Sequence, residues 1–200
     1  MIQRLLIILF FIGLISCNSS KQTVKEPQEI KLEQIRNVIQ KTGFVILPLI
    51  FDANIDGTLK SDYKVDFKSN DSLIFESDIW SIVGFLPDTT DYFAFLFYTV
   101  GDMLYPTIMT IDKKGNKIDR QIICAAGCAG HTVLEVSSCY DSVWISKDLK
   151  IKSISKVIGT VITEDSIPQT LNICNMRQLT GFIDKNGKIK TKDSELIDCN

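Results

Sequence analysis

Apolar and polar residues are arranged in three different ways along this chain. Residues 5–15 form an unbroken apolar run, and residues 18–28 are polar without periodicity. From residue 44 onward, short apolar runs are separated by Asp, Asn, Gly and Ser. A helix as long as the first run covers roughly half of a hydrocarbon core, so this run is too short to span a membrane.

An amphipathic helix is predicted just before the short runs begin. Pro27 suits a first helical turn, and Gly43 suits a helix stop. Between them, apolar residues recur at helical spacing, at Leu32, Ile35, Val38 and Ile39.

The short runs predict strands, because they are rich in Val, Ile, Phe, Tyr and Thr and no long helical crossover separates them. Residues 92–100 are apolar at odd and even positions alike, which is typical of a strand covered on both faces. Residues 149–152 alternate instead, with Leu149 and Ile151 predicted inward and Lys150 and Lys152 outward. The predicted fold is mainly β, an antiparallel meander sheet with one N-terminal amphipathic helix. The sheet is a curled sheet or partly open barrel, closed around its own core or covered by the helix.

Two segments predict the same hairpin. "IDKKGNKI" (residues 111–118) and "IDKNGKIK" (residues 183–190) each contain Ile-Asp, two polar residues and a glycine. In both, we expect the glycine to take the left-handed backbone position before the next strand.

The N-terminus predicts a secretory leader. Arg4 precedes the apolar run and the small Ser16 follows it. Residues 14–17 resemble the lipobox of bacterial lipoproteins, a resemblance that implies lipidation of Cys17. The alternative is an ordinary signal peptide followed by a cysteine.

The predicted organisation has three parts: a signal peptide (1–16), the lipidated Cys17 with a flexible tether (17–28), and a single β-rich domain (29–200). The formal net charge of −2 and the scattered lysines provide no basic stripe, which argues against nucleic acid as a partner.

With the lipobox leader, the polar tether, the β meander and the two DKxG hairpins in view, the chain resembles the small envelope lipoproteins of Bacteroidota. The resemblance implies a membrane-anchored protein on the periplasmic or surface side of the cell envelope. It implies no particular activity.

One segment has part of a calcium loop. "DANIDGTLKSDY" begins like an EF-hand loop. Tyr63 stands where the bidentate glutamate is needed, and Lys60 adds a positive charge. The alternative is a plain turn between strands. We therefore assign no cofactor and keep calcium as the alternative, with candidate ligands Asp52, Asn54, Asp56 and Asp62.

A second segment, "CAAGCAGHTVLEVSSC", brings Cys124, Cys128, His131 and Cys139 together in sequence. The spacing suits a zinc site only in part. Outside the cytoplasm thiols are generally oxidised, so we favour disulfides.

Lipidation of Cys17 would leave an odd number of cysteines, hence two bridges and one remaining thiol. The candidates are Cys124, Cys128, Cys139, Cys174 and Cys199. We expect Cys139 to pair with Cys124 or Cys128, and Cys174 with Cys199.

No catalytic residues are assigned. His131 is the only histidine, no GxSxG elbow occurs, and the Ser-x-x-Lys pattern of residues 153–156 falls in a predicted strand. We therefore predict a lipid-anchored binding or envelope-interaction module whose partner is an envelope protein or a glycan. An accessory or inhibitor of a secreted partner is the alternative, and a hydrolase is a weaker one. Exposed aromatic residues near Trp80, Phe85 or Trp144 would favour binding, and a polar cleft around His131 would favour catalysis.

Overall fold

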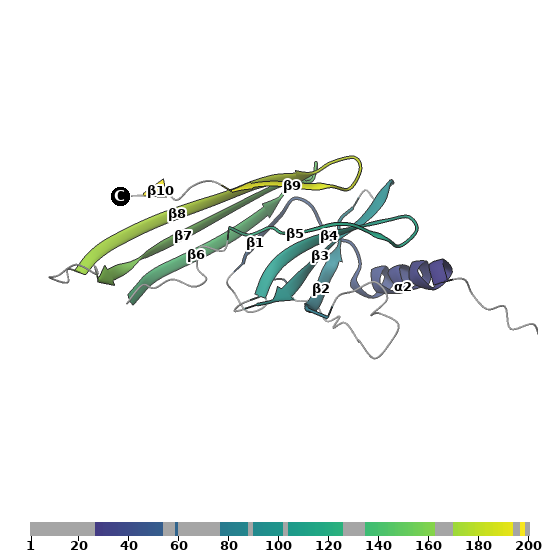
Figure 1. The fold of residues 1–200 in the computed structure, drawn as a ribbon, viewed down its shortest axis with the longest axis horizontal. Coiled ribbons are helices and arrows are strands. Elements are labelled where there is room, and N and C mark those ends of the chain that lie inside the picture. The colour runs from purple at the N-terminus through teal and green to yellow at the C-terminus, as the bar shows by residue number, and fades with distance from the viewer. Residues whose placement is uncertain are drawn as a thin grey trace, which may run out of the picture.

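The computed structural model describes residues 27–53, 59, 77–87, 90–101, 104–125, 135–162, 170–193 and 197–198. This part of the chain is mainly β, with two antiparallel sheets and the helix α2 (Pro27–Thr42). The predicted fold class is confirmed. Figure 1 shows the larger sheet along one side of the molecule, the smaller sheet beneath part of it, and α2 beyond the smaller sheet.

The smaller sheet is a four-stranded meander in chain order. Its strands are β2 (Ile79–Phe85), β3 (Tyr92–Val100), β4 (Leu104–Asp112) and β5 (Lys117–Ile122). Residues 92–100 form the second of these strands, flanked on both edges and covered on both faces, as their apolar pattern predicts.

The larger sheet is built on three long strands: β6 (Glu135–Ile145), β7 (Lys150–Ile162) and β8 (Thr170–Ile183). The short β1 (Leu49–Asp52) pairs with β6 at one edge. At the other edge, β9 (Ile189–Asp193) and β10 (Ile197–Asp198) pair with β8 at different points along it. The long strands extend beyond the smaller sheet (Figure 1).

Two hydrophobic cores hold the three layers together: the larger sheet, the smaller sheet and α2. Between the sheets, the alternate β3 residues Ala94 and Leu96 pack with Val143 and Ile151 of the larger sheet. Between the smaller sheet and α2, Phe95 packs in the same cluster as helix residues. Alternation of side chains along β3 therefore supplies both cores.

Helix α2 begins and ends where its sequence predicts. Gly43 follows its last residue with a φ of 75°, and the Gly43 N–H donates to the Ile39 carbonyl at 2.7 Å. This is a left-handed C-terminal stop, which glycine adopts without steric cost. Ile35 and Val38 are buried against the smaller sheet, so the predicted apolar face is confirmed.

The two predicted hairpins have the same geometry. Gly115 and Gly187 have φ values of 84° and 77°. In each, the N–H of the glycine donates to the carbonyl of the aspartate three residues earlier, Asp112 or Asp184, at 3.0 and 2.9 Å. Each aspartate side chain also accepts two backbone N–H groups within its turn.

A third hairpin repeats this turn without glycine. Between β6 and β7, the Leu149 N–H donates to the Ser146 carbonyl at 3.1 Å, and Leu149 has a φ of 58°. The Ser146 hydroxyl accepts the Lys150 N–H at 3.0 Å, as the aspartates do in the other turns. Leucine is strained in this conformation by about 1–2 kcal/mol. Packing of its partly buried side chain on the inter-sheet core offsets this strain.

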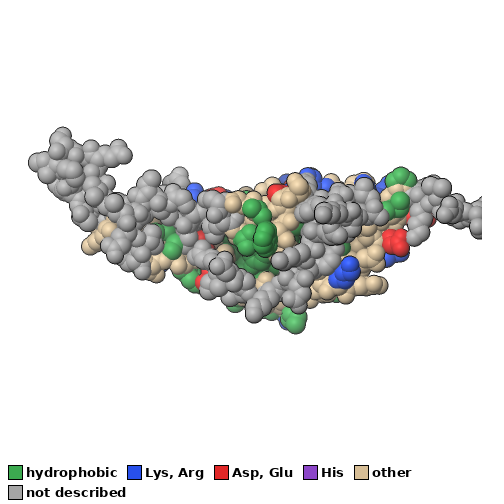
Figure 2. All heavy atoms as spheres, turned by 90° about the horizontal axis from the view of Figure 1, so that it is seen from below, with side chains coloured by type: hydrophobic (Ala, Val, Ile, Leu, Met, Phe, Trp, Pro, Cys, Tyr) green, Lys and Arg blue, Asp and Glu red, His purple; other side chains and the backbone are tan. Residues whose placement is uncertain are grey.

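Of the predicted leader and tether, residues 1–28, residues 1–26 lie outside the described residues. Pro27 and Gln28 belong to α2, so the prediction of a flexible tether up to residue 28 is wrong at its last two residues. Among the described helical residues, none forms a segment long and apolar enough to cross a membrane. Figure 2 views the molecule from below and shows hydrophobic side chains gathered near the middle of that surface, with charged side chains of both signs scattered around them.

Candidate binding surface

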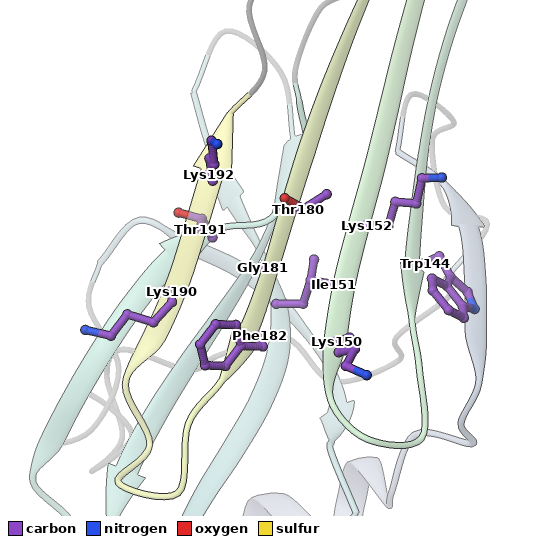
Figure 3. Close-up of a pocket in the computed structure, with 10 residues that line it drawn as sticks. All are labelled: Trp144, Lys150, Ile151, Lys152, Thr180, Gly181, Phe182, Lys190, Thr191 and Lys192. Atoms are coloured by element: carbon purple, nitrogen blue, oxygen red, sulfur yellow. The ribbon is translucent and has the colours of Figure 1, made fainter.

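The outward face of the larger sheet carries a compact set of lysine and aromatic side chains, here named the lysine–aromatic face. It is defined by Trp144, Lys150, Lys152, Thr180, Phe182, Lys190 and Lys192, which come from β6, β7, β8 and β9 (Figure 3). Together with backbone of the strands they line a hollow of about 430 Å³. This volume lies within the range of small-molecule sites.

Strand register arranges these residues in two rows. The first crosses the sheet through Trp144, Lys152, Thr180 and Lys192. The second, two residues along each strand, consists of Lys150, Phe182 and Lys190. Because neighbouring strands lie ~4.8 Å apart, the outer lysines of each row are separated by about 10 Å at the backbone, with β8 between them.

The sequence builds this face through simple alternation. Along β7, Ile151 is 2% exposed in the inter-sheet core, while Lys150 and Lys152 on either side are exposed. The aromatic residues are half-buried, with Trp144 38% and Phe182 48% exposed. Other large apolar side chains on the same face are also exposed, namely Ile50, Tyr140 and Ile158. Exposed apolar residues gathered in this way mark interaction surfaces.

The lysine–aromatic face is positively charged. Lys150 Nζ lies 2.6 Å from Asp148 Oδ2, and Asp148 also accepts a hydrogen bond from the Ser146 hydroxyl. The Lys150 contact and this hydrogen bond lower the pKa of Asp148 to about 2, and the same contact raises the pKa of Lys150. Within the described chain, Lys152, Lys190 and Lys192 form no ion pair.

A second cavity, of about 630 Å³ and here named the inter-sheet cavity, is lined by polar and apolar residues of both sheets. From the smaller sheet, Arg120 lines this cavity and forms two hydrogen bonds with the Asp78 carboxylate, from Nη1 at 3.1 Å and Nη2 at 2.5 Å. Arg120 Nη2 also donates to Thr99 Oγ1 at 3.3 Å. From the larger sheet, Arg177 and Asp193 line the same cavity.

The chemistry of this inter-sheet cavity favours a structural ion pair over acid catalysis. The hydrogen bond from Arg120 holds the pKa of Asp78 below its ordinary value, so this carboxyl stays ionised near neutral pH. The guanidinium is in turn occupied by Asp78, and it lies over the Phe97 ring at 5.3 Å. The pair therefore ties β5 to the residue just before β2.

The Ser-x-x-Lys pattern is part of β7, as the sequence predicts. Ser153 is fully buried, and its hydroxyl accepts the Ala125 N–H at 2.9 Å. This serine therefore helps to fix the end of the smaller sheet against the larger one.

Of the four candidate calcium ligands, only Asp52, the last residue of β1, belongs to the described residues. Asn54, Asp56 and Asp62 lie outside the described residues. Where the structure does describe the chain, no group of three or more His, Cys, Asp and Glu side chains could hold a metal ion. The proposed calcium loop stays a prediction.

The cysteines divide into two kinds. Cys139 on β6 and Cys174 on β8 are disulfide-bonded, while Cys124 after β5 keeps its thiol and is buried. The remaining candidates, Cys128 and Cys199, lie outside the described residues, as do Cys17 and His131. Retention of the Cys124 thiol leaves Cys128 as the expected partner of Cys139, and the predicted pairing of Cys174 with Cys199 stays a prediction.

The three aromatic residues singled out in the sequence differ in exposure. Trp80 is 52% exposed, and Trp144 belongs to the lysine–aromatic face. Phe85 is fully buried between the smaller sheet and α2, so it cannot form part of an exposed patch. Sequence analysis missed Phe182 and Lys190, although both stand in alternating stretches that flank a predicted hairpin.

Comparisons of this chain with protein-family models, with characterised proteins and with solved structures found no match. The function of this protein is therefore inferred from its own residues, described above.

Proposed function

We propose that this protein is a binding module held at a bacterial envelope membrane by lipid attached to Cys17. The lipobox-like residues 14–17, directly after an apolar run, support the anchor. The disulfide-bonded Cys139 and Cys174 support an oxidising compartment, because disulfides persist outside the cytoplasm and are rare within it.

The lysine–aromatic face is the observation that carries the binding role. Its half-exposed Trp144 and Phe182 lie among lysines in a hollow on an otherwise solvent-facing sheet. Sheets with one uncovered face are normally polar on that face, so apolar side chains there need another explanation. Recognition of a ligand or partner explains both the aromatic rings and the charge around them.

Lipid at Cys17 would hold the lysine–aromatic face near the membrane. Each buried methylene of an acyl chain contributes about 0.8 kcal/mol, and two or more chains hold a protein stably at a bilayer. A lipidated Cys17 would thus keep the folded domain, whose first described element is α2, close to the membrane surface.

The anchor is tested by expressing the full chain in a Gram-negative host and comparing it with Cys17→Ser. We expect the wild-type protein in the membrane fraction, with an intact mass that shows loss of residues 1–16 and added acyl groups. The variant should be released in soluble form, outside the cytoplasm. A wild-type protein that keeps Met1 and gains no fatty mass contradicts the proposal.

A further inference from the structure

The charge on the lysine–aromatic face selects an anionic ligand. Lys152, Lys190 and Lys192 have no carboxylate partner among the described residues, and the Asp148 carboxylate is engaged by Lys150. A bound anion would supply the missing partners, and each ammonium group offers three hydrogen-bond donors to it.

The aromatic rings select a ligand that also has an apolar surface. Phe182 is directly paired with Lys150 on one side and Lys190 on the other. A ring placed on Phe182 would therefore have an ammonium group at each side. Pyranose rings match this arrangement, because their C–H faces stack on aromatic rings while acidic substituents project from their edges.

The spacing selects a chain over a single small anion. Trp144 and Phe182 stand two strands apart and two residues apart along the strands, which puts their backbones about 12 Å from each other. One sugar ring cannot contact both aromatic residues, but successive rings of one polysaccharide can. Lys152 and Lys192, on either side of β8, and Lys190 on β9 would then meet repeated charges along that chain.

The shape of the surface argues against a lipid bilayer as the ligand. Membrane-inserting side chains must reach past the charged groups around them. Trp144 and Phe182 instead lie half-buried within a hollow, and lysines of the neighbouring strands β7 and β9 flank Phe182 (Figure 3).

We propose that the lysine–aromatic face binds an acidic polysaccharide, with Trp144 and Phe182 stacking on sugar rings. Lys152, Lys190 and Lys192 contact its carboxylate or sulfate groups, while Lys150 stays paired with Asp148. This proposal rests on the proposed binding function and names the ligand class for it. It assigns no reaction to the site.

Fluorescence of Trp144 in a Trp80→Phe background provides the direct readout, because the chain contains two tryptophans. The probes are oligogalacturonate and dextran sulfate as acidic chains, neutral dextran as the uncharged chain, and vesicles of phosphatidylglycerol with phosphatidylcholine. We expect saturable changes with the acidic chains only. Binding should weaken as ionic strength rises, because salt screens exposed charges.

The double variant Lys190→Gln/Lys192→Gln tests the charges. We expect about tenfold weaker binding, which corresponds to about 1.4 kcal/mol shared between two exposed contacts. The matched control is Lys113→Gln/Lys114→Gln in the β4–β5 hairpin, which changes the net charge equally and should leave affinity unchanged.

Removal of the indole tests stacking. Trp144→Ala should also weaken binding about tenfold, measured by calorimetry because the fluorescent reporter is lost, whereas Trp144→Phe should retain most affinity. Unchanged circular dichroism and melting temperature would show that these exposed substitutions leave the fold intact.

Several results would overturn the ligand class. Equal binding of neutral dextran would show that charge does not select the ligand, and preference for vesicles would identify a lipid surface. Binding unaffected by the lysine and tryptophan variants, or the absence of binding to both acidic chains, would also refute it. None of these results bears on the Cys17 mass measurement, so failure of this inference is distinguishable from failure of the proposed anchor.

Discussion

The two sheets differ in how many of their faces are covered by other parts of the molecule. The smaller sheet is covered on one face by the larger sheet and on the other by α2, so β3 is apolar at almost every position. The larger sheet is covered by the smaller one on its inner face, while its outer face presents lysines and half-exposed aromatic residues. Burial therefore determines the residues of the smaller sheet, whereas the outer face of the larger sheet remains available for selection by function.

Disulfides add to this contrast. Both described disulfide-bonded cysteines, Cys139 and Cys174, lie on the long strands of the larger sheet. Among the described residues, the side chains of these strands in the inter-sheet core lie towards the opposite strand ends: Val143, Ile145, Ile151, Leu179 and Ile183. Covalent links thus reinforce the part of the molecule where packing contributes less.

The largest expected effect compares one phenylalanine from each sheet. Phe95 is fully buried, and its ring centroid lies 5.5 Å from that of Phe85. Phe95→Ala should lower the free energy of unfolding by about 3–5 kcal/mol. Phe182→Ala, on the outer face, should lower it by less than about 1 kcal/mol. Urea unfolding measures both values. Similar losses for the two variants would show that Phe182 contributes to folding as a core residue does, and that its side chain is not free to bind a ligand.

Reduction of the disulfides should have the next largest effect. We expect a loss of about 2–4 kcal/mol for removal of a native disulfide. Hydrogen exchange should increase in β6 and β8 more than in β3, because the cysteines lie on the larger sheet.

Alkylation with mass spectrometry counts the bridges in the unfolded, lipidated protein. Reduction should expose four additional sulfurs, and Cys124→Ala should leave that number unchanged because Cys124 keeps its thiol. Five reactive sulfurs before reduction would contradict the disulfide assignment.

Two hairpins can be compared at the one residue in each that has a positive φ, Gly187 and Leu149. Gly187 has a φ of 77°, and an added Cβ would lie 2.9 Å from Ile118 Cδ1. Gly187→Ala should therefore destabilise the protein by about 1–3 kcal/mol, through strain and steric contact. Leu149→Gly relieves similar strain but loses side-chain packing, so its net effect should stay within about 1 kcal/mol. Thermal unfolding of both variants measures the two losses in stability. If Leu149→Gly destabilises the protein as much as Gly187→Ala does, packing of the leucine side chain outweighs the backbone strain.

The smallest predicted effect concerns the Asp78–Arg120 pair in the inter-sheet cavity. Because the folded-state pKa of Asp78 is lowered, its contribution is present above its ordinary pKa of 3.8 and is lost as the pH falls through the folded-state value. Asp78 is 44% exposed, so the contribution should be at most about 1 kcal/mol.

Asp78→Asn should remove this part of the acid dependence, measured by urea unfolding between pH 2 and pH 7. Asp193→Asn is the matched control, because Asp193 lines the same cavity and forms no ion pair within the described residues. Identical pH profiles for the two variants would refute the role assigned to the ion pair.

Much of the fold could be predicted because its signals are local. Three features can each be read from a short stretch of sequence. They are the helical spacing of apolar residues in α2, the apolar residues at both odd and even positions of β3, and the two DKxG hairpins. The hairpin at Leu149 could not be found in this way, since leucine does not mark a left-handed position. Its turn is supported by long-range packing on the inter-sheet core, which no local pattern reveals.

The lysine–aromatic face could be predicted only in part. The outward lysines of residues 149–152 follow from alternation, and Trp144 was a candidate by type. The predicted hairpin at residues 183–190 already places Phe182 opposite Lys190. That both lie beside Lys150 depends on the pairing of β7 with β8, which no local pattern specifies. Division of the strands between two sheets is another long-range property, and it explains why Phe85 is a core residue.

The pairing of β1 with β6 has a consequence for the order of folding. Helix α2 and strands β2 to β5 all lie within residues 27–122, so the smaller sheet and its helix can assemble as soon as that length of chain has emerged. Strand β1 must wait for β6, which arrives more than 80 residues later in the sequence. Until then, the face of the smaller sheet that later meets β6 and β7 is bare, and a nascent chain at this stage is the form most in need of a chaperone.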